Sequence, residues 1–259
     1  MEKPSVHYSP QSNEVEVFKA AHRASLPVLL KGPTGCGKSR FVEYSAAALG
    51  LPLVTVACNE DTSASDLIGR FLLKNGETVW QDGPVPRAMK MGALLYLDEV
   101  VEAREDVIVL IHPLTDHRRE LYLDRTNETL RAHPSFQLVM SYNPGYQSGL
   151  KEMKPSTAQR CVTIPFVYPE PDFERKILEK ETGCESPVAE KLVGIATKVR
   201  SLNELGLKET VSTRLLVHAA LLHKNGLSLR DSAISAIAGP LSDDPEITQA
   251  LGDLIRLKL

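Results

Sequence analysis

Residues 32–39, which read Gly-Pro-Thr-Gly-Cys-Gly-Lys-Ser, have the types and spacing of a phosphate-binding loop. Glycines let backbone N–H groups face an anion without a Cβ in the way, and a following helix adds the positive end of its dipole. Lys38 is expected to reach the outer phosphates of ATP, and Ser39 to bind Mg²⁺. The candidate phosphate-binding residues are Gly32, Pro33, Thr34, Gly35, Cys36, Gly37, Lys38 and Ser39.

The flanking sequence has the context that this motif requires. The apolar run Pro27–Lys31 is typical of a strand, and Arg40–Leu49 is typical of a helix. Strand, glycine turn and helix together distinguish a true phosphate loop from a chance match. The alternative, a glycine-rich turn that binds nothing, is disfavoured because a second motif agrees with the first.

That second motif is Leu94–Glu99, an apolar run that ends in two adjacent carboxylates. A short run of this kind is typical of a strand buried on both faces of a parallel sheet. Strand alternation sends Asp98 and Glu99 in different directions. Asp98 is therefore predicted to serve Mg²⁺, and Glu99 to orient the water that attacks the γ-phosphate. The pair favours ATP hydrolysis over phosphate transfer, although two solvated acids at a strand end are the simpler alternative.

The remaining pattern predicts an α/β domain at residues 1–168 and a small all-α domain at 169–259, separated by a proline-bearing linker. Asn75-Gly76 between extended runs predicts a β-hairpin, and residues 120–131 predict a second one. Residues 59–65 are interpreted as a loop, and Ser186 as a helix N-cap followed by Pro187. Further strands are predicted at 53–57, 136–141 and 161–167, and further helices at 14–24, 84–91 and after residue 170.

Composition limits the possible partners and location. The 259 residues carry a net charge of −3, so no basic surplus indicates nucleic-acid binding. The chain lacks an apolar run of the ~18 residues that a membrane span needs, and its polar N-terminus is unlike a signal peptide. The four cysteines form no CxxC pair and indicate reduced thiols. We expect a cytoplasmic protein without membrane insertion.

These features together resemble the AAA+ ATPases. The similarity rests on the phosphate loop, the acidic pair, Asn143 at a strand end, Arg160 before the last strand, and the helical second domain. The two hairpins resemble the MoxR branch. The stretches 66–71 (DLIGRF), 79–84 (VWQDGP) and 211–214 (VSTR) resemble the CbbQ/NorQ family within that branch.

The resemblance implies a three-layer α/β/α AAA+ domain with a parallel sheet and inserted hairpins, followed by a helical lid. It also implies an ATP- and Mg²⁺-dependent homo-oligomer, expected to be a hexameric ring, that works with a partner carrying a von Willebrand factor A domain. The client expected first is inhibited Rubisco, as for CbbQ. Nitric oxide reductase maturation, as for NorQ, is the alternative.

The resemblance also assigns roles to three further residues. Asn143 would orient the attacking water, Arg214 would contact the γ-phosphate from the lid, and Arg160 would enter the site of the neighbouring subunit. A turn-forming asparagine and salt-bridged surface arginines are the simpler alternatives. Three other arginines compete with Arg160 for the role in the neighbouring site: Arg104, Arg118 and Arg119.

Two other function classes fit less well. A small-molecule kinase or nucleotide switch would need an acceptor pocket and a mobile charged lid motif, and the sequence indicates neither. A nucleic-acid motor would show a basic stripe. Phe71 and Trp80 flank the first predicted hairpin, where they either contact a protein segment or pack the hairpin.

Overall fold

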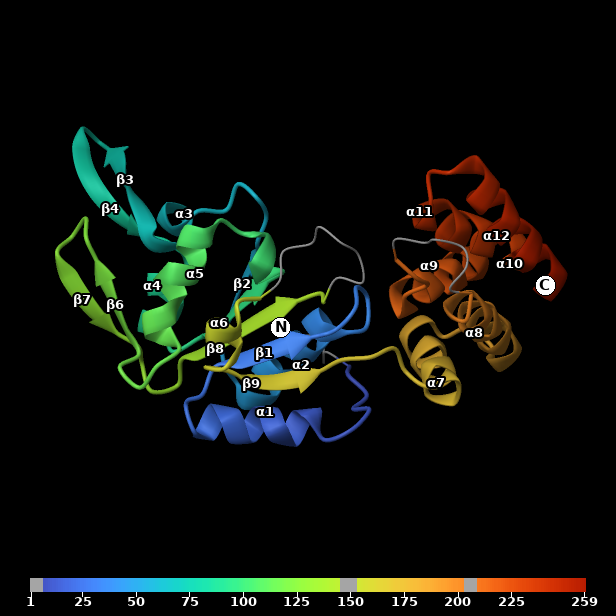
Figure 1. Cartoon of the computed structure of the whole chain (residues 1–259), viewed down its shortest axis with the longest axis horizontal. Coiled ribbons are helices and arrows are strands. Elements are labelled where there is room, and N and C mark those ends of the chain that lie inside the picture. Colours follow the sequence, from blue (N-terminus) through green and yellow to red (C-terminus); the bar gives the residue numbers. More distant parts are fainter. Residues whose placement is uncertain (1–6, 145–152, 203–208) are drawn as a thin grey trace. The chain divides into compact units, whose positions relative to one another are not determined.

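The computed structural model describes residues 7–144, 153–202 and 209–259, which divide into two compact units. The first comprises the chain up to Gly32 together with Lys38–Phe166, and the second comprises Pro33–Gly37 and Val167–Leu259. The first unit combines a sheet with helices, whereas the second is helical (Figure 1). In the described part of the chain, every helix is too short or too polar to cross a bilayer.

A five-stranded parallel sheet in the order β2-β5-β8-β1-β9 forms the centre of the first unit (Figure 1). Val28 of β1 is paired with Val139 of β8 on one side and with Val162 of β9 on the other. The strands are β1 (Val28–Lys31), β2 (Leu53–Ala57), β5 (Leu94–Asp98), β8 (Gln137–Tyr142) and β9 (Val162–Pro165). This sheet with its flanking helices confirms the predicted α/β class.

Helices cover both faces of the sheet because alternate strand residues point to opposite sides. Leu95 of β5 and Met140 of β8 belong to the core formed with α3, α4 and α5. On the opposite face, Phe18 of α1 and Phe41 of α2 make an edge-to-face contact with centroids 5.4 Å apart. The helices and short turns are α1 (Glu14–Arg23), α2 (Lys38–Leu49), α3 (Ala64–Ile68), α4 (Pro84–Met91), η1 (Val100–Glu102), α5 (Glu105–Ile111), η2 (His112–Leu114) and α6 (Pro155–Ala158).

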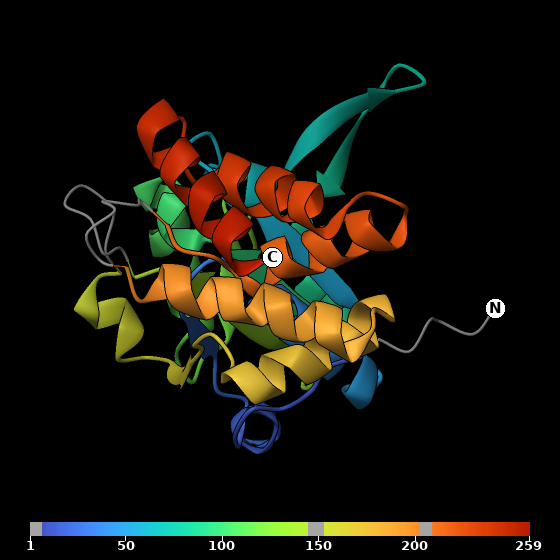
Figure 2. The same ribbon diagram turned by 90° about the vertical axis from the view of Figure 1, so that its right-hand side faces the viewer.

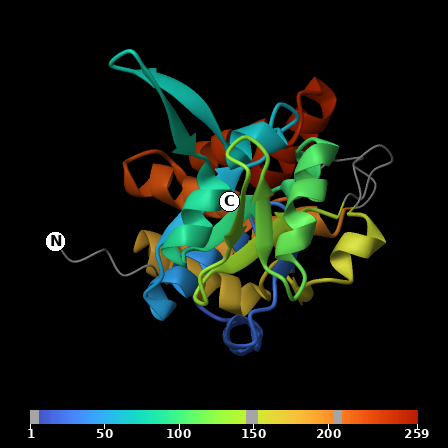
Figure 3. The ribbon, with the colours of Figure 1, turned by 90° about the vertical axis from the view of Figure 1, so that its left-hand side faces the viewer.

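Two antiparallel hairpins are inserted into this unit, as predicted. The first pairs β3 (Gly69–Lys74) with β4 (Glu77–Asp82), and the second pairs β6 (Glu120–Leu123) with β7 (Glu128–Arg131). Asn75 and Gly76 both have positive φ, as a two-residue hairpin turn requires. The first hairpin projects from the rest of its unit (Figures 2 and 3), and within it the ring centroids of Phe71 and Trp80 lie 5.0 Å apart.

The second unit is a small helical bundle around an apolar core that includes Leu178, Leu192, Leu216 and Ile255. Its regular elements are α7 (Pro171–Thr182), α8 (Ser186–Arg200), α9 (Thr213–Lys224), α10 (Leu229–Ala233), η4 (Ile234–Ala238), α11 (Gly239–Leu241) and α12 (Pro245–Lys258).

Two local predictions are wrong at the residue where a helix begins. The predicted loop at 59–65 ends in α3, because Ser63 and Asp66 form a capping box: the Ser63 hydroxyl accepts from the Asp66 N–H, and the Asp66 carboxylate accepts from the Ser63 N–H. Ser186 is not an N-cap. It is the first helical residue of α8, and Glu185 occupies the cap position without a side-chain hydrogen bond.

A buried ion pair ties together three helices of the second unit. Both terminal nitrogens of Arg200 donate to the carboxylate of Glu174, at 2.7 and 2.8 Å, and the Thr213 hydroxyl donates to the same carboxylate at 2.6 Å. Glu174 is completely buried. A buried carboxylate of this kind is tolerated because its partners satisfy it.

We therefore expect Glu174→Ala to lower the free energy of unfolding of this unit by about 3–5 kcal/mol, because Arg200 is left buried without its partner. Hydrogen exchange of the amides of α7–α9 measures this quantity. The control is Asp253→Asn, which breaks the exposed pair with Arg256 and is expected to cost at most about 1 kcal/mol. Equal losses for the two variants would contradict the expectation.

Candidate functional site

The glycine-rich segment lies between β1 and the first residue of α2, as its sequence predicts. Gly35 and Gly37 have φ values of +70° and +99°, which side chains with a Cβ rarely adopt. The Cys36 thiol donates to the carbonyl oxygen of Pro33 at 3.0 Å. Because α2 begins at Lys38, the positive end of its helix dipole faces this loop, where it would favour an anion.

Lys38 is buried, with 7% of its surface exposed, and its ammonium group is held by neutral acceptors. Its Nζ atom donates to the carbonyl oxygen of Gly32 and to Oδ1 of Asn143, both at 2.7 Å. Gly32 and Asn143 follow the carboxyl ends of the neighbouring strands β1 and β8, which explains why they meet. Phosphate oxygens are stronger acceptors for an ammonium group than these two.

Ser39 and Asp98 offer oxygen donors at the same edge of the sheet. The Ser39 hydroxyl lies 3.4 Å from Oδ2 of Asp98. This pair fits Mg²⁺, which prefers oxygen ligands and commonly takes one or two carboxylates together with phosphate and water. Among the described residues no group of three or more His, Cys, Asp or Glu is placed to hold a metal.

Glu99 has left-handed backbone angles, φ 54° and ψ 45°, which are unfavourable for a residue with a Cβ. Its backbone N–H donates to the Ser141 hydroxyl at 3.0 Å, and its Oε1 accepts from the amide of Asn143 at 3.1 Å. Asn143 thus connects Glu99 to Lys38 in one hydrogen-bonded chain. Backbone strain of this kind is concentrated at functional sites.

The structure brings together one subset of the predicted residues: Lys38, Ser39, Asp98, Glu99 and Asn143. Arg160 and Arg214 do not belong to this hydrogen-bonded group, although the Cβ atom of Arg214 lies beside Gly35 of the phosphate loop, which is part of the same second unit. Arg160 is exposed between α6 and β9, and Arg214 is exposed near the start of α9 in the helical unit. In the described ranges, the guanidinium group of neither arginine forms a hydrogen bond or ion pair with another residue, although the Arg160 backbone N–H donates to the Thr157 carbonyl oxygen at 3.2 Å.

The three rivals of Arg160 are all engaged within this chain. Arg118 binds the carboxylate of Asp116 with two nitrogens, the closer at 2.6 Å. Arg119 donates to the Phe136 carbonyl oxygen, and Arg104 pairs with Asp106 at 3.8 Å.

Sequence reasoning missed two residues of this network, Tyr96 and Ser141. Both hydroxyls donate to Oδ1 of Asp98, at 2.6 and 2.5 Å. Burial, followed by the hydrogen bond to Asp98, raises the pKa of the Tyr96 phenol well above its usual value. Tyr96 was detectable as a site residue, because residues two apart in a strand share a face. Ser141 was not, because its place beside Asp98 depends on the pairing of β5 with β8.

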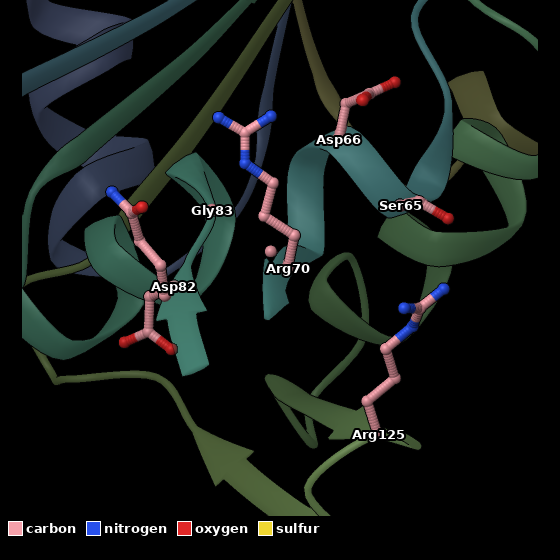
Figure 4. A pocket seen from close by; sticks show the side chains of 8 residues that line it. Ser65, Asp66, Arg70, Asp82, Gly83 and Arg125 are labelled. Carbon is pink, nitrogen blue, oxygen red and sulfur yellow. The ribbon is translucent and has the colours of Figure 1, made fainter. Parts of the chain in front are cut away.

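A separate polar hollow of about 410 Å³ lies beside the first hairpin (Figure 4). Its lining includes Asp66, Arg70 and Asp82, together with Arg125 from the turn of the second hairpin. None of the residues in the Lys38–Asn143–Glu99 chain lines this hollow, so it does not belong to the nucleotide site.

Comparisons with known proteins show the family to which this chain belongs. Residues 27–161 match the AAA domain family of the dynein-related subfamily, and residues 174–258 match the CbbQ/NirQ/NorQ C-terminal family. The chain is 56% identical to protein NorQ of Paracoccus denitrificans over 95% of its length and 92% of the relative. It is 54% identical to the denitrification regulatory protein NirQ of Pseudomonas aeruginosa, over 96% of both chains. Protein CbbQ of Hydrogenophilus thermoluteolus is 53% identical, over 95% of this chain and 92% of the relative.

The fold also has solved counterparts. A mutant of RuvB from Thermotoga maritima matches with a TM-score of 0.59 and 14% identity, over 98% of this chain and 73% of the other. At that identity the likeness shows a shared fold only. Together with the AAA domain match at residues 27–161, it confirms the predicted fold class.

The strain at Glu99 is testable without any ligand. Glycine adopts left-handed angles freely, so we expect Glu99→Gly to be about 1 kcal/mol more stable to unfolding than Glu99→Ala. Urea unfolding followed by the fluorescence of Trp80, the single tryptophan, measures the difference. Lys19 is an exposed position inside α1 and provides the control. There the alanine variant should be more stable to unfolding than the glycine variant. If alanine were as stable as glycine at position 99, the backbone there would not be strained.

Proposed function

Because this chain belongs to the CbbQ/NirQ/NorQ family of AAA ATPases, we propose that it is the motor subunit of a ring that remodels a client protein. The chain of hydrogen bonds from Lys38 through Asn143 to Glu99 supports this proposal most directly. One continuous network contains an ammonium group suited to phosphate, an amide suited to orienting water and a carboxylate suited to accepting a proton.

The geometry suggests how these residues act on ATP. Lys38 exchanges the acceptors of Gly32 and Asn143 for oxygens of the outer phosphates. Asn143 is then free to orient the attacking water, and Glu99 accepts its proton. Mg²⁺, held by Ser39 and Asp98, would neutralise charge on the phosphates.

Two arginines complete the proposed cycle. Arg214 contacts the γ-phosphate from the helical lid, and Arg160 contacts it from the neighbouring subunit. Arg160 is the stronger candidate for the neighbouring site because its rivals Arg104, Arg118 and Arg119 are bound within their own chain. Release of the γ-phosphate removes charge-assisted hydrogen bonds worth about 1.5–3 kcal/mol each, which is enough to shift a rigid-body equilibrium between subunits.

The first hairpin is a suitable contact for a protein client, because it exposes apolar side chains. Leu73 is 77% exposed and Phe71 is 45% exposed. Apolar groups gathered on a projecting element are typical of protein-binding surfaces. We propose that a hexameric ring uses this hairpin, together with a partner carrying a von Willebrand factor A domain, to act on the client.

Two clients are proposed. Inhibited Rubisco is the first, and the relative named CbbQ supports it. An enzyme of denitrification, as nitric oxide reductase is for NorQ-type members, is the second, and the relatives named NorQ and NirQ favour it. Identities of 53–56% do not rank the two. Phosphate release without any added acceptor would exclude the small-molecule kinase alternative.

Glu99→Gln should bind ATP with unchanged affinity and lose about 10²–10⁴-fold in phosphate release, because the carboxylate that accepts the proton is gone. The same variant is the control for client assays. With the von Willebrand factor A partner present, sugar-phosphate-inhibited Rubisco and immature nitric oxide reductase are each incubated with wild type and with E99Q. The client is the enzyme whose activity recovers with wild type and does not recover with E99Q. Undiminished hydrolysis by E99Q would contradict the proposed role of Glu99, and recovery of neither client would contradict the client assignment.

A mixing experiment tests whether Arg160 acts across subunits. Arg160→Ala should lose about 10³–10⁵-fold in hydrolysis, as other trans-acting arginines do. E99Q subunits keep Arg160 but cannot hydrolyse, so they should restore activity to the intact sites of R160A neighbours. The rate of ATP hydrolysis by mixed rings is expected to exceed the rate of either variant alone by at least about tenfold. Arg118→Ala is the matched control and should retain activity. Mixtures no faster than their parents would show that Arg160 does not act in trans.

A further inference from the structure

We propose that Tyr96 and Ser141 are positioning residues that hold one oxygen of the Asp98 carboxylate and thereby reserve its other oxygen for the magnesium ion. This inference rests on the proposed function of Asp98 and adds to it a mechanism of orientation.

The two oxygens of Asp98 have different surroundings. Oδ1 accepts hydrogen bonds from the Tyr96 phenol at 2.6 Å and from the Ser141 hydroxyl at 2.5 Å. Two donors occupy both lone pairs of that atom. Oδ2 faces the Ser39 hydroxyl at 3.4 Å, which is the other candidate metal ligand. The carboxylate therefore presents a single oxygen to the metal in a fixed direction.

Both hydroxyls are enclosed by the fold beside the candidate metal ligands, and the Tyr96 oxygen also lies 3.5 Å from the Ser39 hydroxyl. Tyr96 is 1% exposed and Ser141 is completely buried, so both need hydrogen-bond partners inside the protein. Tyr96 and Asp98 share a face of β5 because they are two residues apart. Leu97 is paired with Met140 in the neighbouring strand, which brings Ser141 level with Asp98.

Ser141 has a second task that Tyr96 lacks. Its oxygen accepts the backbone N–H of Glu99 at 3.0 Å while its proton goes to Asp98. One hydroxyl can do both, since it has one donor and two acceptor sites. Ser141 thereby connects Asp98, the proposed metal ligand, to the strained backbone of Glu99, the proposed proton acceptor. The two hydroxyls should consequently affect different kinetic constants.

Tyr96→Phe should raise the Mg²⁺ concentration for half-maximal hydrolysis about tenfold, because a carboxylate with one donor fewer is free to turn. Its kcat at saturating Mg²⁺ should stay within about twofold of wild type. Ser141→Ala should raise the Mg²⁺ requirement by a similar factor and also lower kcat about tenfold, because Glu99 loses its backbone anchor.

Metal affinity is measured separately from turnover. In the Glu99→Gln background, binding of Mn²⁺ to the ATP complex is followed by electron paramagnetic resonance. Adding Y96F or S141A should weaken Mn²⁺ binding about tenfold. Tyr44→Phe, which removes a phenolic hydroxyl elsewhere in the same unit, is the control. It should leave the Mg²⁺ requirement, kcat and the Mn²⁺ affinity unchanged.

An unchanged Mg²⁺ requirement and unchanged Mn²⁺ affinity in Y96F would overturn the inference. So would a Mn²⁺ affinity in S141A equal to that of Y44F. A wild-type chain without Mg²⁺-dependent hydrolysis would instead contradict the proposed function, so the two failures are distinguishable.

Discussion

The adjacency of β5, β8 and β1 at the centre of a parallel sheet is the constraint on which the site depends. Parallel strands all end at the same edge, so the residues that follow them meet there. β1 leads into the glycine loop and Lys38, β5 ends at Asp98, and Asn143 follows β8. Lys38 and Asn143 are 105 residues apart in the chain, yet their side chains are 2.7 Å apart. No local structure could produce that contact.

Within this edge, the protein holds groups that are unfavourable by themselves. Lys38 is a buried cation whose described partners are neutral oxygens, and Glu99 has left-handed backbone angles. Neutral acceptors bind an ammonium group less strongly than a carboxylate would. They are therefore suited to being displaced by phosphate. The packed cores on both faces of the sheet stabilise the strained arrangement that isolated loops would relax.

The helical unit uses a buried ion pair to fix the element that carries Arg214. Arg200 is held by Glu174 and also donates to the Val211 carbonyl oxygen at 2.8 Å, directly before α9. Thr213, the residue next to Arg214, donates to the same Glu174 carboxylate. The start of α9 is thus held by two contacts within this unit, from Arg200 to Val211 and from Thr213 to Glu174. In the proposed cycle, an anchored Arg214 transmits a force on its guanidinium to the whole bundle.

Local patterns in the sequence were enough to predict most elements of this protein. The phosphate loop, the acidic pair and the Asn75-Gly76 hairpin follow from residue types at short spacing, because turn geometry and strand alternation are local properties. The family motifs led to the AAA+ architecture, whereas the domain boundary after residue 168 and the roles of Arg160 and Arg214 stay predictions. Only the tertiary structure placed Ser141 against Asp98 and showed which arginines are engaged, because strand order and side-chain partners are set by contacts between residues far apart in the chain.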